Sequence, residues 1–205
     1  MPNSASAAPP VAVLCLFGAG GHGRVVASQV RRFLQREVIF ADSRAEVSGL
    51  EIAFQGIETI LGYEVVITIG DNAVRRDLHA KLQAPLSAAL VMEPSRVFSE
   101  QIGAGSQILA GAIINVGANI GQGTIVNSGA IIEHDVQVGD FCHLAPGSVV
   151  GGGAQLGASV LLGTSASVLP GISVASGTII GAGAVVVHDI LVPGTYLGVP
   201  ARNIA

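Results

Sequence analysis

Aromatic side chains, charged side chains and cysteines are all scarce in this 205-residue chain. Tryptophan is absent, aromatic residues make up 4% of the sequence and charged residues 12%. The net charge of −4 provides no basic surface for nucleic acid. Two cysteines, Cys15 and Cys142, make no disulfide framework and indicate a reducing compartment. The apolar run Val11–Phe17 is too short to span a bilayer. We therefore expect a cytoplasmic protein that binds neither nucleic acid nor membrane.

Basic residues are divided unevenly along the chain. Of the ten Lys and Arg residues, only Arg202 follows residue 97. Such a change of composition marks a domain boundary, which we place between about Met92 and Ser99. The predicted organisation is a flexible N-terminus over residues 1–10, a first domain over 11–92 and a second domain over 93–205.

The first domain alternates strand and helix patterns. The glycine-rich segment from Gly18 to Gly23 follows a buried-strand run and opens a helix. The expected elements are strands over 11–17, 38–41 and 65–69, a helix over about 24–36, and a second helix that follows Gly70-Asp71-Asn72 and ends near residue 82. This order predicts a small Rossmann-like α/β domain, with helices packed on a parallel sheet.

The second domain repeats every six residues. From Ile102 to Val186 every sixth residue is aliphatic, fifteen times without an insertion, and the position three residues later is glycine in ten of the first fourteen hexads. This period fits neither an amphipathic helix nor an alternating strand. It predicts a triangular coil with aliphatic residues inside and glycines at corners that need positive φ. The pattern resembles the hexapeptide-repeat left-handed parallel β-helix, in which three hexads form one coil, so about five coils are expected.

One short arc of this repeat concentrates its titratable side chains. Between Ile102 and Val186 the charged residues and histidines are Glu133, His134, Asp135, Asp140 and His143. A histidine titrates near neutrality, and an adjacent carboxylate favours its protonated form, so the pair is suited to general-base work. The alternative is a solvated corner without a function. Cys142 occupies a small inward position, and we expect it to be inert.

The arc also resembles a known family. Asn127-Ser128-Gly129-Ala130-Ile131-Ile132-Glu133-His134-Asp135 and Gly139-Asp140-Phe141-Cys142-His143-Leu144-Ala145-Pro146-Gly147 are similar to the bacterial nucleotide-sugar acetyltransferases of the PglD and NeuD type. So are Phe17-Gly18-Ala19-Gly20-Gly21-His22-Gly23, Ile69-Gly70-Asp71-Asn72 and Gly198-Val199-Pro200-Ala201-Arg202. The resemblance implies acetyl transfer from acetyl-CoA to a nucleotide-linked amino sugar without a metal, in a homotrimer with active sites between subunits.

The resemblance also implies roles for individual residues. His134 matches the general base, Asp135 the acid that raises its basicity, and Asn127 an asparagine of the active site. The residues that match acetyl-CoA contacts are His143, Gly152, Thr164, Ser173 and Ala182, with the N–H of Gly152 facing the thioester oxygen. The residues expected to bind the nucleotide-sugar in the first domain are Gly20, Gly21, His22, Asp42, Ser43 and Gly70. Relatives that bind UDP often carry two acids where this chain has Asp42-Ser43, so the nucleotide stays open.

Three other functions fit parts of the sequence. Gly18-x-Gly20-x-x-Gly23 followed by Asp42 also fits a dinucleotide fingerprint and therefore an NAD-dependent oxidoreductase. A zinc-dependent β-helix enzyme of the γ-carbonic anhydrase type would need three histidine ligands, and this arc offers two. A non-catalytic β-helix that only binds sugar nucleotides is the third. Within the acetyltransferases, the rival acceptor is a sugar hydroxyl, as in O-acetylation of sialic acid.

Overall fold

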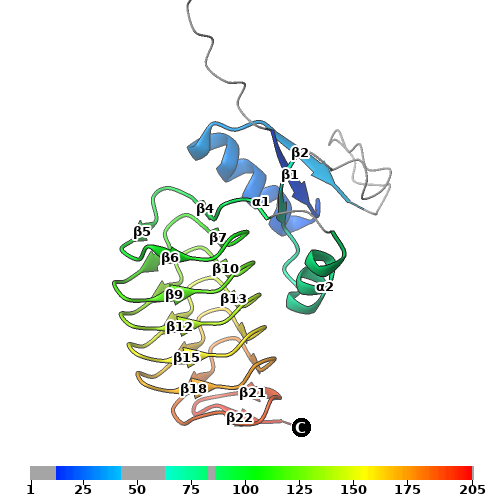
Figure 1. Cartoon of the computed structure of the whole chain (residues 1–205). Helices are drawn as coiled ribbons and strands as arrows, with labels where there is room; N and C mark the ends of the chain where they lie inside the picture. The colour runs from blue at the N-terminus through cyan, green and yellow to red at the C-terminus, as the bar shows by residue number, and fades with distance from the viewer. Residues whose placement is uncertain (1–12, 43–62, 83–85, 205) are drawn as a thin grey trace, which may run out of the picture.

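The first predicted domain forms an α/β layer, which lies at one end of a tall prism of stacked coils that the second domain forms (Figure 1). The computed structural model describes residues 13–42, 63–82 and 86–204. The predicted flexible N-terminus and Ser43 lie outside these residues. No helix in the described ranges is both long and apolar enough to cross a membrane.

The α/β domain contains a three-stranded parallel sheet in the order β2-β1-β3. Its elements are β1 (Leu14–Phe17), α1 (Gly21–Gln29), a π-helical turn η1 (Val30–Leu34), β2 (Val38–Ala41), β3 (Glu64–Ile67) and α2 (Asn72–Leu82). All four residues of the central strand β1 are buried. The predicted small parallel sheet is therefore confirmed.

The first helix begins earlier than the sequence pattern predicts, at Gly21 rather than near Arg24. A side chain at Gly23 would collide with the carbonyl oxygen of Gly18, so the glycine permits the helix to pack against the preceding loop. The helical run ends at Leu34, because Gln35 has a left-handed φ of 51°. Gly21 and Gly23 thus belong to the first turn of the helix, and Gly20 is its N-cap.

Three parallel sheets form the faces of the prism. Face 1 contains β4 (Leu90–Val91), β7 (Gln107–Ile108), β10 (Ile125–Val126), β13 (His143–Leu144), β16 (Leu161–Leu162), β19 (Ile179–Ile180), β21 (Thr195–Leu197) and the antiparallel β22 (Arg202–Asn203). Face 2 contains β5 (Arg96–Val97), β8 (Ile113–Ile114), β11 (Ile131–Ile132), β14 (Val149–Val150), β17 (Ser167–Val168) and β20 (Val185–Val186). Face 3 contains β6 (Gln101–Ile102), β9 (Asn119–Ile120), β12 (Gln137–Val138), β15 (Gln155–Leu156) and β18 (Ser173–Val174).

The hexad register is confirmed by the core of the prism. The aliphatic position of every hexad from Ile108 to Val186 is buried in one cluster, with Ile102 packed against it. Strands pair with strands eighteen residues away, as between Ile131 and Val149, so three hexads make one coil. Face 2 stacks six strands, and the prism has about six coils rather than five, because β4 and β5 already pair with it before Ile102.

The corners adopt the backbone conformation that the glycine pattern predicts. All ten glycines at the third position after an aliphatic residue have positive φ, and Asp135 (60°) and Phe141 (55°) adopt it without being glycine. Aspartate tolerates this region better than most residues, whereas a bulky residue there is an outlier. Asp135 and Phe141 thus occupy positions that usually hold glycine, and their positive φ angles carry a conformational cost.

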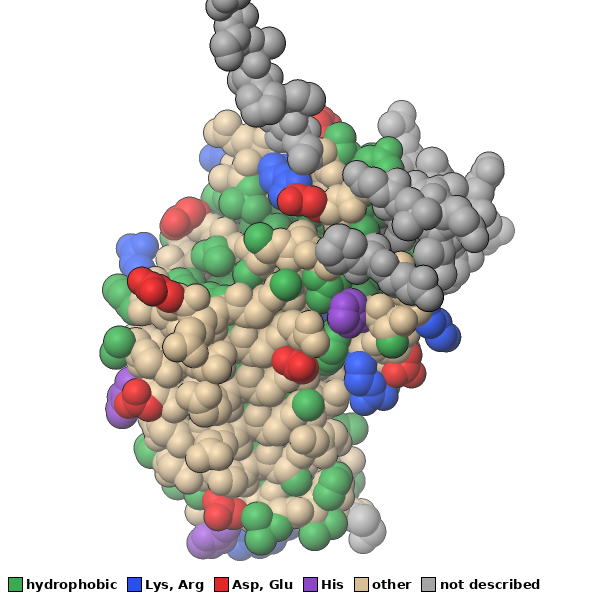
Figure 2. Space-filling model, viewed as in Figure 1, with side chains coloured by type: hydrophobic (Ala, Val, Ile, Leu, Met, Phe, Trp, Pro, Cys, Tyr) green, Lys and Arg blue, Asp and Glu red, His purple; other side chains and the backbone are tan. Residues whose placement is uncertain are grey.

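The α/β domain shares its core with the first coils. Leu90, Met92 and Leu109 pack in one cluster with residues of β1 and α1. β4 lies just before the domain boundary predicted at residue 92, and that division stays a prediction. In the space-filling view most of the visible prism is uncharged, whereas charged side chains gather beside α2 (Figure 2).

Candidate active site

The first cluster of the titratable arc lies at the corner between faces 2 and 3, where β11 ends. Nδ1 of His134 lies 2.9 Å from Oδ2 of Asp135, and the two side chains are 62% and 72% exposed. Because a carboxylate oxygen only accepts hydrogen bonds, Nδ1 carries a proton, and in the neutral form of the ring Nε2 has the lone pair. Nε2 has no hydrogen-bond partner among the residues that the structure describes. The pair therefore presents an open basic nitrogen to solvent.

Two glycines in the neighbouring coils make room for this pair. A Cβ at Gly152 would lie 2.6 Å from Nε2 of His134, so the imidazole ring lies directly against that glycine. A Cβ at Gly117 would collide with Oδ1 of Asp135. The corner position of Gly152 carries side chains in the adjacent coils, at His134 and Pro170. Gly152 is thus needed for the ring above it and not for the turn alone.

The other two acids of the arc hold the scaffold together. Oε2 of Glu133 accepts a hydrogen bond of 2.9 Å from the Asn115 side chain. Oδ1 of Asp140 accepts one of 3.0 Å from the backbone N–H of Gln122. Both carboxylates bridge consecutive coils, so the chemistry of the arc is confined to its histidines and Asp135.

His143 differs from His134 because both of its ring nitrogens are engaged. On β13, Nδ1 donates to the carbonyl oxygen of Gly70 at 3.1 Å, and Nε2 lies 3.1 Å from Nδ2 of Asn127. Oδ1 of Asn127 accepts from the N–H of Ser128 at 2.8 Å, which fixes the amide so that its NH₂ group faces the ring. Burial lowers the pKa of His143 to about 4. The ring is therefore neutral at physiological pH, with its proton on Nδ1.

Cys142, the neighbour of His143, points into the prism as predicted. It belongs to the buried core, and burial raises the pKa of its thiol to about 12. A thiol that keeps its proton is a poor nucleophile. In the described ranges no three His, Cys, Asp or Glu side chains gather as a metal-binding group.

Five of the predicted nucleotide-sugar ligands surround one pocket of about 310 Å³ in the α/β domain. Its lining includes Gly20, Gly21, His22, Asp42 and Gly70. The pocket lies at the N-terminus of α1, where free N–H groups and the helix dipole favour phosphate. The structure thus brings these residues together, and their contacts with a nucleotide-sugar stay a prediction.

Asp42 and His22 have structural partners within that pocket. Oδ2 of the buried Asp42 accepts a 2.8 Å hydrogen bond from the N–H of Ala19, which fixes the glycine loop. Nε2 of His22 donates to Oε1 of Gln107 at 2.9 Å, and the Gln107 amide donates to the carbonyl of Ile67. Burial lowers the pKa of His22. The His22 ring is held neutral, 6.2 Å from that of His143.

The residues expected to contact acetyl-CoA do not lie together within one chain. Gly152 lies at the His134 corner, and Ser173 begins β18 on face 3. Thr164 and Ala182 lie at another corner, between faces 1 and 2, two and three coils below Ser128. Asn127 and His143 also lie on that side, at the far end of β11 from His134. The predicted acetyl-CoA residues therefore form two separate groups on a single chain.

Two residues at the boundary between the domains were not identified from the sequence. The buried Gln107 connects His22 to β3, and the buried Arg75 connects α2 to the prism. Arg75 stands beside Arg76 in α2, and an arginine is ordinarily expected to be solvated. Helical spacing distinguishes the two, because Arg75 shares a face with Leu78 and Leu82, which pack in the core, and Arg76 does not. The partners of Arg75 depend on the packing of α2 against the prism.

The chain was compared with known families and structures. Its residues 13–82 match the PglD N-terminal domain, and residues 117–152 match the bacterial transferase hexapeptide of six repeats. The acetyltransferase domain of PglB from Neisseria gonorrhoeae FA1090 is 32% identical, with a TM-score of 0.86 over 94% of this chain and 99% of that one. A mutant of GDP-perosamine N-acetyltransferase from Caulobacter crescentus, in complex with CoA and GDP-perosamine, is 30% identical, with a TM-score of 0.85 over 96% of this chain and 98% of that one.

Fold and site together define a hexapeptide-repeat transferase with an N-terminal α/β domain. The identity to these relatives extends over both domains. The chain belongs to the nucleotide-sugar acetyltransferases of the PglD type and is an acetyl-CoA-dependent sugar acetyltransferase.

Proposed function

We propose that this enzyme moves the acetyl group of acetyl-CoA to the amine of a nucleotide-linked amino sugar, with His134 as the general base. The observation that carries the proposal is the open Nε2 of His134, whose ring is oriented through Nδ1 by Asp135. Such a nitrogen can accept a proton from an attacking amine at working pH. His143 cannot take this role, because its Nε2 is engaged by Asn127 and its pKa is about 4.

The reaction proceeds by direct attack without an acyl-enzyme. The amine nitrogen bonds to the thioester carbonyl carbon while Nε2 of His134 takes its proton. Negative charge then develops on the carbonyl oxygen, and the N–H of Gly152, beside the ring, is suited to stabilise it. The C–S bond breaks, and the thiolate of CoA receives the proton that the imidazolium returns. The products are the N-acetylated sugar and free CoA.

The nucleotide provides the handle that brings the sugar to this base. The pocket of Gly20, Gly21, His22, Asp42 and Gly70 combines a helix N-terminus with a glycine loop, which suits a diphosphate. One relative is described in complex with CoA and GDP-perosamine, a nucleotide-linked amino sugar. By analogy the acceptor here is a nucleoside diphosphate sugar with a free amine.

A homotrimer would complete the site. The His134 corner, with Gly152 and Ser173, and the corner of Asn127, Thr164 and Ala182 are separated on one prism. When the His134 corner of one copy faces the Asn127 corner of the next, the two corners enclose a groove for acetyl-CoA. The exposed corner residue Val116, one coil from His134, provides apolar surface for such a contact.

The test is a thiol-release assay with acetyl-CoA and a panel of UDP-, GDP- and dTDP-linked amino sugars, with free sialic acid as the hydroxyl acceptor. Turnover with an amino sugar nucleotide, and mass spectrometry that places the acetyl group on nitrogen, supports the proposal. Turnover with sialic acid alone would replace it with O-acetylation. Binding of the nucleotide-sugar without any turnover would favour a sugar-binding protein that has lost catalysis.

Asp42→Asn tests the nucleotide handle separately. We expect a KM for the nucleotide-sugar raised about tenfold, roughly the cost of one lost charge-assisted hydrogen bond, and an unchanged KM for acetyl-CoA. Equal changes in both constants would contradict the assignment of separate sites.

A further inference from the structure

Arg75 is a charged side chain that is only 1% exposed, at the boundary between α2 and the prism. Its guanidinium forms no ion pair with any carboxylate in the described part of the chain. Burial lowers its pKa to about 10, so it stays charged at neutral pH. A buried charge without a counter-ion is costly unless all its donors are satisfied, and this one therefore requires an explanation.

The guanidinium is satisfied by oxygens from both domains. On the prism side, Nε donates to the carbonyl of Gly123 at 2.7 Å, and Nη2 donates to those of Phe141 and Cys142 at 2.9 Å each. On the α/β side, Nη1 donates to Ile69 at 2.8 Å and Gly70 at 3.2 Å, and Nη2 donates to Oδ1 of Asn72 at 2.8 Å. Arg75 thus joins the two domains by six contacts from five N–H donors, so that one N–H of Nη2 is shared between two acceptors.

These contacts surround His143 on two sides. Phe141 and Cys142, whose carbonyls Arg75 holds, lead directly into the backbone of His143. The carbonyl of Gly70, which Arg75 also holds, accepts the Nδ1 proton of His143. Gly70 in turn lines the nucleotide pocket. One planar side chain therefore fixes the ring of His143, its hydrogen-bond partner and the edge of the acceptor pocket relative to one another.

We infer that Arg75 is a positioning residue, which locks His143 in its Nδ1–H form and sets the nucleotide pocket at a fixed distance from the acetyl-transfer groove. The inference rests on the proposed function for its effect on turnover, but its effect on the ring of His143 does not depend on any substrate. Lysine at this position keeps the positive charge but lacks the planar set of N–H donors of a guanidinium. The Arg75→Lys variant therefore distinguishes the effect of hydrogen-bond geometry from the effect of charge.

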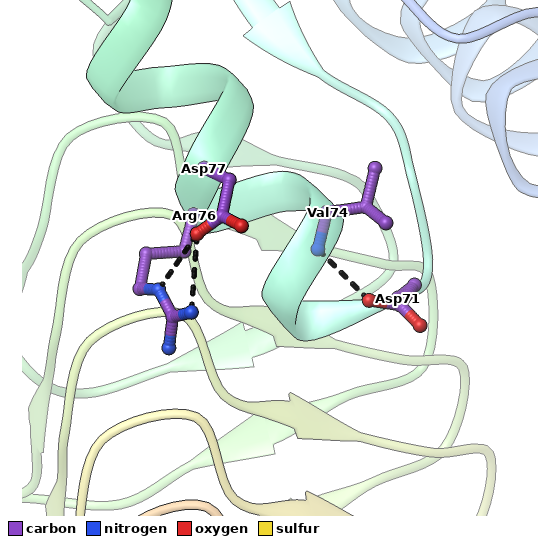
Figure 3. Close-up of polar contacts among 4 residues, drawn as sticks. All are labelled: Asp71, Val74, Arg76 and Asp77. Atoms are coloured by element: carbon purple, nitrogen blue, oxygen red, sulfur yellow. Dashed lines mark hydrogen bonds and ion pairs between the residues drawn. The ribbon is translucent and has the colours of Figure 1, made fainter.

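The neighbouring residue provides a matched control. Arg76 lies on the same helix but is exposed, and it pairs with Asp77 on the outer surface (Figure 3). Arg76→Met removes the same charge one residue away without touching the carbonyls that Arg75 holds. The experiment compares Arg75→Lys, Arg75→Met and Arg76→Met with the wild type, by thermal unfolding, by kcat and both KM values, and by ¹⁵N NMR of the histidine rings.

In the wild type and in Arg76→Met we expect His143 as the Nδ1–H tautomer, with a slowly exchanging ring proton. In Arg75→Lys that proton should exchange faster, and kcat/KM for both substrates should fall about tenfold or more, as displaced positioning groups cause. In Arg75→Met the pKa of His143 should also rise, because the repelling charge is gone. Asn72→Ala, which removes one acceptor of Arg75 and the amide that donates to the carbonyls of Ser159 and Val160, should show the same changes in milder form.

Two results would overturn the inference. One is a wild-type spectrum in which the His143 ring carries its proton on Nε2 or is charged at pH 6.5. This result would refute the inference even if the Arg75 variants fail to fold. The other is an Arg75→Lys protein that unfolds at a lower temperature but keeps wild-type kinetics and ring exchange, since Arg75 would then only stabilise the fold. Failure of acetyl transfer in the wild type would refute the proposed function while leaving the NMR comparison valid.

Discussion

His134 and His143 lie nine residues apart on one scaffold, yet the fold gives them opposite properties. His134 stands on an exposed corner with Nε2 open and Nδ1 bound to a carboxylate. His143 lies between the domains, with a carbonyl on one nitrogen and an amide on the other. The comparison shows that the partners of the ring and its access to solvent, rather than residue type, decide which histidine can exchange protons.

His134→Ala should have the largest effect on this comparison. Removing the base should lower kcat roughly 10²–10⁴-fold, the usual contribution of a positioned general base. The matched control is His188→Ala. His188-Asp189 is the same dipeptide three coils further along the same corner, but Asp189 accepts from the N–H of Ser173 instead of its neighbouring histidine. Wild-type kcat in His134→Ala, or an equal loss of kcat in His188→Ala, would contradict the assignment of His134 as the general base.

Asp135→Asn should have the next largest effect. Asparagine tolerates the positive φ of this corner, so the backbone should be retained. The amide can also present its NH₂ group to Nδ1, which favours the tautomer with a proton on Nε2, and kcat should fall about 10- to 10²-fold. Thiol release at saturating substrates measures the loss. If kcat is unchanged and only the thermal midpoint moves, Asp135 serves the turn and not the base.

Gly152→Ala probes the space beneath the ring. The added methyl carbon would lie 2.6 Å from Nε2 of His134, so the ring must rotate away from its present position. We expect kcat to fall about tenfold, since small displacements of a catalytic group are costly, with little change in the thermal midpoint because the ring is free to move into solvent. Wild-type kcat would show that the observed ring position is not the working one.

His143→Asn should have the smallest effect on stability at neutral pH, and it tests how that stability depends on pH. Because the pKa of His143 is about 4 in the fold against 6.5 ordinarily, the unfolded chain binds its proton more readily. The stability from the neutral ring is therefore complete above pH 6.5 and is lost as the pH falls towards 4. Asparagine does not titrate and its amide is placed to keep the bond to Gly70.

The measurement is the thermal midpoint at pH 7 and at pH 4.5 for both proteins. The wild type should lose more of its midpoint between these values than His143→Asn does. His22, whose pKa is also lowered, and the carboxylates are present in both proteins and cancel in the difference. Equal losses would contradict a buried neutral ring at this position.

Features that depend on the six-residue repeat could be predicted from the sequence. Contacts between segments far apart in the chain could not. The inward register from Ile108 to Val186 and the positive φ of the corner glycines follow from each hexad by itself, and both are confirmed. The pairing of His134 with Asp135 follows from their adjacency. The start of α1 is different, because the approach of Gly23 to Gly18 is local and only the position of the first helical residue was missed. The hydrogen-bond partners of Arg75 and Gln107 depend on the contact between domains and are not encoded within a few residues.

The unbroken hexads also place equivalent corner positions at regular intervals along the axis of the prism. A shift of eighteen residues moves a side chain one coil along the axis, about 4.8 Å, and leaves it on the same corner, as with Ile131 and Val149. Grafting the His134-Asp135 pair onto Gly152-Gly153, with Pro170→Gly to make room beneath the ring, would therefore move the base by one coil without rotating it. The reach from nucleotide to reacting amine could then be matched to longer or shorter sugars in discrete increments.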